Sequence, residues 1–173
     1  MTREALEIPG VILLRPTVHE DERGSFMEIF READLGVPFV QGNHSRSRAG
    51  VLRGLHYHRR QSDAWYVIRG RARVGLADVR ERSGQTLTVD LSGDEPAVLY
   101  LPPGVAHGFY ALTDMELIYW VTHYYDNTDE FGVTWDDPTL AVPWQASDPI
   151  LSDRDRSAPP LDWTQVDAVL VDG

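Results

Sequence analysis

Hydrophobic positions along the chain fall into short runs rich in Val, Ile, Tyr and Trp, and Gly and Pro residues separate these runs. Short runs of this composition, bounded by turn-forming residues, predict β-strands. The predicted strands are 11–14, 25–30, 64–68, 72–77, 86–91, 98–101 and 117–122. Reverse turns are expected between them, because they are separated by the turn-favouring sequences Arg69-Gly70, Ser83-Gly84, Ser92-Gly93 and Pro102-Pro103-Gly104.

Helix signals are few by comparison. Residues 31–35 predict a single turn, and residues 163–171, which follow the capping residue Asp162, predict a short C-terminal helix. Many short strands with almost no helical periodicity are typical of a β-sandwich or barrel. We therefore predict an all-β fold of the jelly-roll kind with a short helix at the C-terminus.

The length of 173 residues favours one domain with a substantial core, because a chain of this size buries roughly 70% of its unfolded surface. One stretch does not fit the strand pattern. Residues 147–160 (SDPILSDRDRSAPP) are polar and proline-rich. Such a composition ordinarily predicts an exposed linker.

Composition and charge exclude several classes of function. All 16 basic residues are arginine, there are 27 acidic residues, and the net charge is -11. The absence of lysine excludes lysine Schiff bases and the phosphate-binding lysine of a P-loop. An acidic chain is also not expected to bind nucleic acid or an anionic membrane. Any anionic ligand would have to be bound by a local cluster of arginines.

The chain has no cysteine, which excludes disulfides, thiolate nucleophiles and cysteine-bound metals. No apolar run approaches the roughly 20 residues of a membrane span, and the first residues lack a signal-peptide pattern. The cytosol is therefore the expected compartment.

Histidine carries the first indication of function. His56 and His58 are two residues apart, so in a strand their side chains would project from the same face. The series Gly50, His56, His58, Asp63 and Gly70 has the spacing of the first motif of cupin barrels, with Asp63 where cupins usually have Glu. The segment 102–107 (PPGVAH), which ends in His107, resembles the core of the second cupin motif. Together the motifs predict a cupin jelly roll, or double-stranded β-helix, with these side chains at its mouth.

Longer blocks resemble a narrower cupin family, the nucleotide-sugar 3,5-epimerases that act on dTDP-4-dehydro-6-deoxyglucose in deoxysugar biosynthesis. The blocks lie between residues 9 and 144, with a further match at 151–155, and read DERGSFMEIF, QGNHSRSRAGVLRGLHYH, LYLPPGVAHGF, YWVTHYYDNTDEFGVTWDDPTLAVPW and LSDRD. The resemblance implies a single cupin domain over 1–173, with a core of about 9–145. It also implies that residues 146–173 fold back over the barrel mouth.

The resemblance implies roles for individual residues. His56 falls on the family's general base, Asp155 on the acid that orients it, and Tyr119 on the general acid. The remaining matches are substrate-binding positions, and the cupin motif adds His58 and Asp63 to them. The predicted substrate-binding residues are Arg23, Glu28, Gln41, Asn43, Arg53, His58, Asp63, His107, Tyr125, Glu130 and Arg154. The partners implied are a nucleotide sugar and a second copy of the chain, in a homodimer whose N-terminal residues reach the partner's site. No cofactor is implied.

The implied chemistry suits these residue types. A 4-keto group acidifies the C–H bonds at C3 and C5, so a neutral imidazole with a fixed tautomer can remove a proton there. Asp155 would fix the tautomer by accepting from the other ring nitrogen. Inversion needs a second proton donor on the opposite face, for which the Tyr119 phenol is suited. Arg23 and Arg53 can bind a diphosphate through bidentate hydrogen bonds.

One position departs from the family. Its members normally carry a lysine at the start of the strand that leads to the next glycine, where the ammonium stabilises the enolate oxygen, and this position is Asp63 here. A carboxylate there would repel the developing oxyanion. If the chain is an epimerase, another group would have to stabilise the oxyanion. The candidates are His58, held as an imidazolium by Asp63, and otherwise His107 or an arginine.

Two alternatives remain open at this level. His56, His58, Asp63 and His107 together are suitable ligands for Zn, Fe, Mn or Ni, which would make the chain a metal-dependent cupin; this conflicts with His56 acting as a base. The chain could also be a sugar-nucleotide binder without catalysis, although the joint presence of His56, Asp155 and Tyr119 argues against that. We favour an isomerase that epimerises a nucleoside-diphosphate 4-keto-6-deoxysugar at C3, C5 or both, and the sequence does not identify the nucleotide base.

Overall fold

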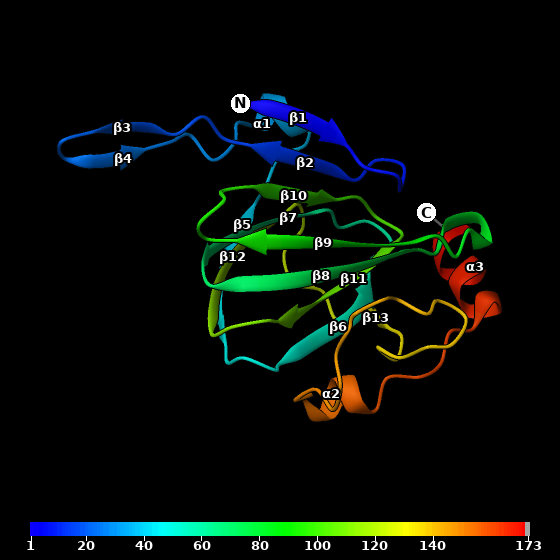
Figure 1. The fold of residues 1–173 in the computed structure, drawn as a ribbon. Coiled ribbons are helices and arrows are strands. Elements are labelled where there is room, and N and C mark those ends of the chain that lie inside the picture. The colour runs from blue at the N-terminus through cyan, green and yellow to red at the C-terminus, as the bar shows by residue number, and fades with distance from the viewer. Residues whose placement is uncertain (172–173) are drawn as a thin grey trace.

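The computed structural model describes residues 1–171 and is a jelly roll of two packed antiparallel sheets (Figure 1). The six-stranded sheet has the order β1 (Thr2–Ala5), β2 (Ile12–Arg15), β10 (Val98–Leu101), β7 (Asp63–Arg69), β12 (Met115–Val121) and β5 (Gln41–Ser47). The five-stranded sheet has the order β13 (Phe131–Gly132), β6 (Leu52–Tyr57), β11 (Val105–Ala111), β8 (Arg71–Asp78) and β9 (Thr86–Ser92). The all-β, cupin-like jelly roll predicted from the sequence is confirmed.

The main core lies between the two sheets. Val67, Leu99 and Leu117 of the six-stranded sheet pack against Leu76 and Phe109 of the five-stranded sheet. These side chains are almost fully buried, and each contributes roughly 1.5–3 kcal/mol of hydrophobic stabilisation. Every second residue of a strand points to the same face, so further residues of these strands also point inward toward one end of the sandwich.

Both outer faces of the sandwich are also partly covered. On the five-stranded sheet, a second cluster joins Leu55 and Tyr57 to Val133, Trp144 and Val166 from the C-terminal part of the chain. On the six-stranded sheet, a third cluster is formed by Ile12, Leu14, Leu35, Ala64, Tyr66, Val98 and Tyr100. Covered outer faces explain why several strands are continuously apolar and were readily predicted.

Helices are short and lie at the periphery (Figure 1): α1 (Glu32–Leu35), α2 (Asp153–Arg156), α3 (Trp163–Val171) and a 3₁₀ turn, Arg80–Arg82. The expected C-terminal helix is confirmed at its predicted bounds. Most residues of the expected linker 147–160 are exposed, as predicted, but the segment is tied to the body at two points. Ile150 forms a parallel bridge with Val51, and the α2 residue Asp155 is only 4% exposed. No helix of residues 1–171 is long and apolar enough to cross a membrane.

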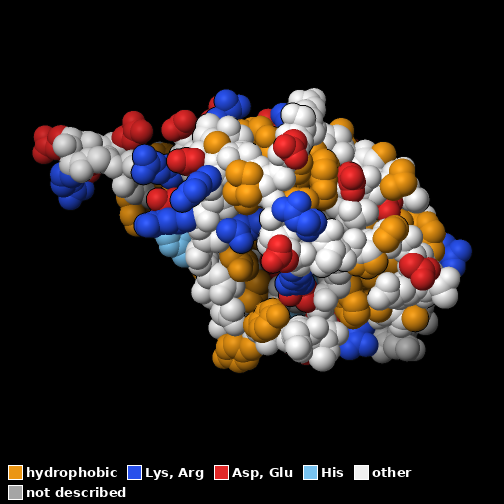
Figure 2. Space-filling model, turned by 90° about the horizontal axis from the view of Figure 1, so that it is seen from below, with side chains coloured by type: hydrophobic (Ala, Val, Ile, Leu, Met, Phe, Trp, Pro, Cys, Tyr) orange, Lys and Arg blue, Asp and Glu red, His pale blue; other side chains and the backbone are white. Residues whose placement is uncertain are grey.

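A two-stranded hairpin of β3 (His19–Asp21) and β4 (Gly24–Phe26) stands out from the body as a narrow arm (Figures 1 and 2). The strand predicted over residues 25–30 is therefore wrong beyond Phe26. Phe30 instead packs edge-on against Phe39 and Trp120, outside any strand. Alternation alone did not distinguish a strand from a segment that anchors the base of the arm to the body.

A close approach of two glycines joins β6 to β11. A Cβ atom at Gly54 would lie 2.6 Å from the Cα atom of Gly108, and Gly54 has a φ of +127° that side chains rarely allow. Next to this contact the register of the two strands shifts between His107 and Phe109, and His107 lies opposite His56. The glycine pair thus brings two histidines of neighbouring strands side by side.

Candidate active site

A cavity of about 420 Å³ opens between the two sheets at one end of the sandwich. Its walls come from opposite sheets. Tyr119 of β12 lies in register with Asn43 of β5 and Trp65 of β7, so these three side chains share the inner face of the six-stranded sheet. The facing wall comes from β6 and β11. Most of the predicted site residues line this cavity: Gln41, Asn43, Arg53, His56, His58, Asp63, His107, Tyr119, Tyr125, Glu130 and Arg154.

His56 of β6 is held from behind by the C-terminal segment. Its Nε2 atom lies 2.9 Å from Oδ1 of Asp155, and Oδ2 of Asp155 accepts a 2.7 Å hydrogen bond from the Ser152 hydroxyl. Burial alone would raise the pKa of Asp155, but the hydrogen bonds from His56 and Ser152 outweigh it and hold this pKa below its ordinary value. The ionised carboxylate favours the tautomer with a proton on Nε2. Nδ1 of His56 is then the basic nitrogen.

Helix α2 supplies this contact because Ser152 caps its first turn. The Ser152 hydroxyl accepts from the backbone N–H of Asp155, and the same hydroxyl donates to the Asp155 carboxylate. The preceding residue, Arg154, donates to Glu130 at 2.9 Å, and Glu130 lies 3.8 Å from Nδ1 of His56. One short helical turn therefore delivers both a carboxylate behind His56 and an arginine at the cavity.

Tyr119 faces the cavity from the opposite wall. Burial, together with the carboxylates of Asp63 and Glu130, raises the pKa of the Tyr119 phenol, and Arg53 opposes this effect only in part. The phenol is therefore protonated at neutral pH and is available as a proton donor. His56 and Tyr119 thus place an imidazole and a protonated phenol on facing walls of one cavity.

Deeper in the cavity, three buried groups converge: His58, Asp63 and His107 offer ligand atoms that all lie within 4.8 Å of one another. Asp63, the first residue of β7, accepts from Gln61 at 2.8 Å and from the indole N–H of Trp65 at 3.1 Å. Its Oδ2 lies 3.9 Å from Nε2 of His107. Burial lowers the pKa of His107 to about 4, although the Asp63 carboxylate opposes this shift.

This arrangement corrects two expectations. His56 does not belong to the cluster, because its Nε2 is bonded to Asp155, so the metal-ligand set of His56, His58, Asp63 and His107 is not assembled as predicted. His58 is also not paired directly with Asp63. The Gln61 amide lies between them, 3.2 Å from Nε2 of His58 and 2.8 Å from Oδ1 of Asp63. The sequence spacing could not reveal which way each imidazole turns.

Two predicted binding residues lie away from the cavity of their own chain. Arg23 is at the tip of the arm, where its side chain is 85% exposed and paired with Asp21, and Glu28 is paired with Arg31. Arg53 does line the cavity and donates to the Ser47 hydroxyl at 3.1 Å. Most of the predicted substrate-binding residues therefore line the cavity of the described chain, but Arg23 and Glu28 do not.

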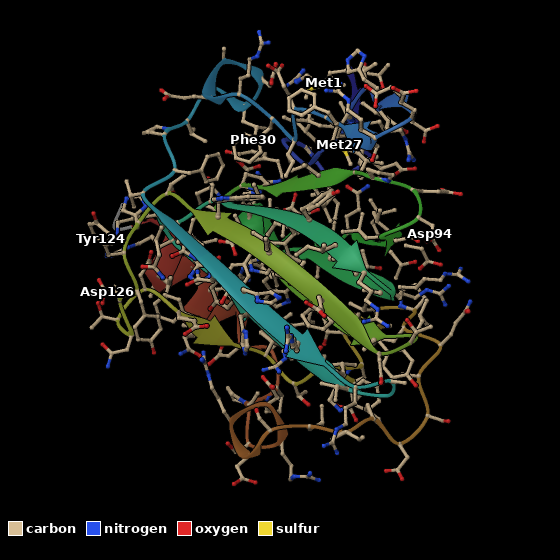
Figure 3. The ribbon with its side chains drawn as sticks, turned by 90° about the vertical axis from the view of Figure 1, so that its left-hand side faces the viewer. Met1, Met27, Phe30, Asp94, Tyr124 and Asp126 are labelled. Carbon is tan, nitrogen blue, oxygen red and sulfur yellow. The ribbon has the colours of Figure 1, made fainter. Side chains whose placement is uncertain are left out.

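Several lining residues were not predicted: Ser45, Gln61, Trp65, Gly108, Phe109, Leu117, Val121 and Asp126. Alternation could have found some of them, since Ser45 and Trp65 lie two positions after predicted site residues on the same strand face. Gln61 and Asp126 lie in loops, and no pattern in the sequence marks them. Asp126 lies beside Tyr124 in the loop that follows β12, at one edge of the molecule (Figure 3).

Comparisons with known proteins place the chain in a family. The family model described as dTDP-4-dehydrorhamnose 3,5-epimerase matches residues 5–162. The chain is 39% identical over 162 residues to the dTDP-4-dehydrorhamnose 3,5-epimerase of Shigella flexneri. The aligned region covers 86% of this chain and 90% of the relative.

Solved structures show the same similarity. The crystal structure of dTDP-6-deoxy-D-glucose-3,5-epimerase from Legionella pneumophila, in complex with dTDP-4-keto-L-rhamnose, matches with a TM-score of 0.87 and 36% identity, covering 98% of this chain and 96% of that one. ChmJ, a 3'-monoepimerase from Streptomyces bikiniensis in complex with dTDP-quinovose, matches with a TM-score of 0.85 and 32% identity, covering 95% and 90%.

Proposed function

Because the chain belongs to the dTDP-4-dehydrorhamnose 3,5-epimerase family, we propose that it epimerises a nucleoside-diphosphate 4-keto-6-deoxysugar for deoxysugar biosynthesis. The observation that carries this proposal is the placement of His56 and Tyr119 on facing walls of one cavity, with Asp155 bonded to His56 at 2.9 Å. Inversion of a carbon needs a base on one face and an acid on the other. These two side chains supply that pair.

In the proposed reaction, Nδ1 of His56 removes the proton from the carbon beside the 4-keto group. The electron pair of the C–H bond forms the enolate double bond, and the carbonyl electrons move to the 4-oxygen. Tyr119 then donates its proton to the opposite face of the same carbon. Asp155 acts through His56, because its ionised carboxylate holds the proton on Nε2 and stabilises the imidazolium that forms.

The polar side chains around this pair are proposed to bind the substrate. Arg53 and Arg154 supply positive charge for the diphosphate, which allows a chain of net charge -11 to bind a polyanion. Gln41, Asn43 and Tyr125 lie on the β5 and β12 side of the same opening. They are placed to contact the nucleotide or the sugar.

A homodimer is the proposed assembly, with the arm of one chain reaching the cavity of its partner. The arm exposes Phe26 (67% exposed) together with Arg23, and neither contributes to the cavity of its own chain. An exposed aromatic residue beside a charged one on a projecting hairpin is suited to contact another subunit. We also propose a cytoplasmic location.

The proposal is tested by incubating the protein with dTDP-4-dehydro-6-deoxyglucose in deuterated water and following the sugar by NMR. We expect deuterium at C3, C5 or both, and the labelled positions would show which carbons are inverted. His44→Gln is the matched control, because His44 is an exposed histidine bonded to Glu116 outside the cavity. Absence of deuterium at both carbons would contradict the proposal.

A further inference from the structure

We propose that His58, Asp63 and His107 bind a divalent first-row transition-metal cation, and that this cation polarises the 4-keto oxygen of the substrate. The metal site is argued from the geometry of the three side chains alone, whereas its catalytic role rests on the proposed function. The site differs from the four-residue set expected from the sequence, because His56 is left free to act as the base.

The three donors are close together and shielded from solvent. Their ligand atoms lie within 4.8 Å of one another, and the residues are 8%, 3% and 6% exposed. Nitrogen and oxygen ligands lie about 2.0–2.2 Å from such a cation, which places neighbouring ligands of a tetrahedral or octahedral site roughly 3 to 3.6 Å apart. Oδ2 of Asp63 and Nε2 of His107 lie 3.9 Å apart. Metal binding therefore requires the three side chains to move closer together than they lie in this structure.

Each imidazole is turned so that its Nε2 atom faces the carboxylate. Nδ1 of His58 lies 2.6 Å from the carbonyl oxygen of Asp129, and Nδ1 of His107 lies 2.8 Å from that of Val105. A carbonyl oxygen can only accept, so both Nδ1 atoms carry the proton and both Nε2 atoms present a lone pair. Backbone carbonyls orient metal-binding histidines in this way in many proteins.

The carboxylate has its own supporting contacts. Trp65 donates to Oδ2 of Asp63 and Gln61 donates to Oδ1. Both donors are neutral, so they orient Asp63 without supplying a positive charge. The Gln61 amide also reaches Nε2 of His58 at 3.2 Å. In the metal-bound protein this second contact would give way to the cation, while the bond from Gln61 to Asp63 is kept.

The proposed reaction also calls for a cation at this depth. An ionised Asp63 beside a developing enolate oxygen would repel it, and the chain contains no lysine. Among the described residues that line the cavity, the arginines are Arg53 and Arg154, which are bonded to Ser47 and Glu130. A cation held by Asp63 reverses the sign of the local charge.

Two imidazoles and one carboxylate suit Zn²⁺, Fe²⁺, Mn²⁺, Co²⁺ or Ni²⁺ and leave coordination positions open for the substrate. The proposed cation acts only as a Lewis acid. The proton leaves carbon for His56, the carbonyl electrons collect on the 4-oxygen, and the cation stabilises that oxygen until Tyr119 returns a proton to carbon. No electron is gained or lost by the metal.

The site is tested by binding of Co²⁺, whose visible absorption reports on its ligands. Full-length protein purified without a metal-affinity tag is treated with chelator, dialysed and titrated with Co²⁺, in parallel with calorimetry. We expect one Co²⁺ per chain with new visible bands. Asp63→Asn and His107→Gln should each weaken binding at least tenfold, whereas His44→Gln should bind as the wild type does. Circular dichroism shows which variants fold, and His58→Gln replaces any that does not.

The outcomes separate the metal site from the proposed function. No stoichiometric binding to the wild-type protein, or unchanged binding to the folded ligand variants, would overturn the site. If the site binds Co²⁺ but the metal-free enzyme incorporates deuterium at the wild-type rate, the Lewis-acid role is overturned and the epimerase proposal stands. If no form of the protein incorporates deuterium while Co²⁺ still binds, the proposed function fails and the metal site stands.

Discussion

Nε2 of His56 lies 2.9 Å from Oδ1 of Asp155, a residue 99 positions later in the chain. This contact connects a strand of the five-stranded sheet to a four-residue helix in the C-terminal segment. The carboxylate is held in place by Ser152, so it is positioned before any substrate binds. The tautomer and orientation of His56 therefore depend on a part of the chain far from its own strand.

Replacing Asp155 by Asn should lower kcat by about 10²- to 10⁴-fold, because an amide neither fixes the correct tautomer nor stabilises the imidazolium. KM should change little, since Asp155 lies behind His56 and does not line the cavity. Steady-state kinetics on the 4-keto sugar nucleotide measures both constants. Asp153→Asn is the matched control because Asp153 is an exposed acid of the same helix. Equal kcat values for Asp155→Asn and the wild type would remove Asp155 from the mechanism.

Asp155 should also make stability depend on pH. Its pKa is held below the ordinary value of 3.8, so the folded state binds fewer protons than the unfolded state as pH falls through this region. The stabilisation is fully present above about pH 4 to 5, where the unfolded carboxyl is ionised, and is lost as pH falls through the lowered pKa of the folded state. Urea unfolding of the wild type and Asp155→Asn should therefore differ at pH 6 and converge toward pH 3. A difference that stays constant with pH would contradict this account.

The contact between Gly54 and Gly108 should be intolerant of a methyl group. Gly54→Ala would place Cβ 2.6 Å from a backbone Cα atom, in addition to the strain of a φ of +127°. We expect it to lower the free energy of unfolding by about 3 kcal/mol or more, as measured by chemical denaturation. Gly24→Ala is the matched control, because Gly24 has the same φ but no atom within 4 Å of the added Cβ. Equal effects would show that backbone strain alone matters at Gly54.

Much of the fold follows from hydrophobic pattern, because strands such as β7 and β10 are buried on both faces over most of their length and read as apolar runs. Strand β5 (QGNHSRS) could not be found in this way. Its inward positions are polar because they line a cavity instead of the core. Helix α2 is equally invisible to local patterns, since its stability comes from the cap at Ser152 and from the distant contact with His56.

Part of the arrangement of the candidate site could also be anticipated. Family resemblance pointed to His56, Asp155 and Tyr119, and the structure places the first two in contact and the third across the cavity, while their roles stay a prediction. Spacing alone grouped His56 with His58. In the structure the two imidazoles have different orientations, because His56 is hydrogen-bonded to Asp155 and His58 to the carbonyl of Asp129. Such orientations depend on residues about 70 to 100 positions away, which no motif contains.

The proposed role of the arm is tested by mixing two inactive variants. Arg23→Ala removes the arginine at the tip of the arm, and His56→Asn removes the base. If the arm crosses to the partner, a mixed dimer contains one cavity with both an intact base and an intact Arg23. Mixed and refolded protein should then recover up to about a quarter of the wild-type activity, as random pairing predicts.

Recovery should be absent when Arg23→Ala is mixed with the double variant R23A/H56N, which can supply no intact arm. Analytical ultracentrifugation of each mixture establishes that dimers are present. Full activity of Arg23→Ala alone, or no recovery in the first mixture despite dimer formation, would contradict a role for the arm in the partner's cavity.

The most direct test of the central claim separates proton removal from inversion. In deuterated water, Tyr119→Phe keeps His56 but loses the acid on the opposite wall. It should still exchange the proton beside the 4-keto group, with retention of configuration, while the rate of inversion falls at least 100-fold. His56→Asn should lose both exchange and inversion. NMR resolves the label and the configuration at each carbon. Inversion by Tyr119→Phe at the wild-type rate, or exchange by His56→Asn at the wild-type rate, would contradict the account.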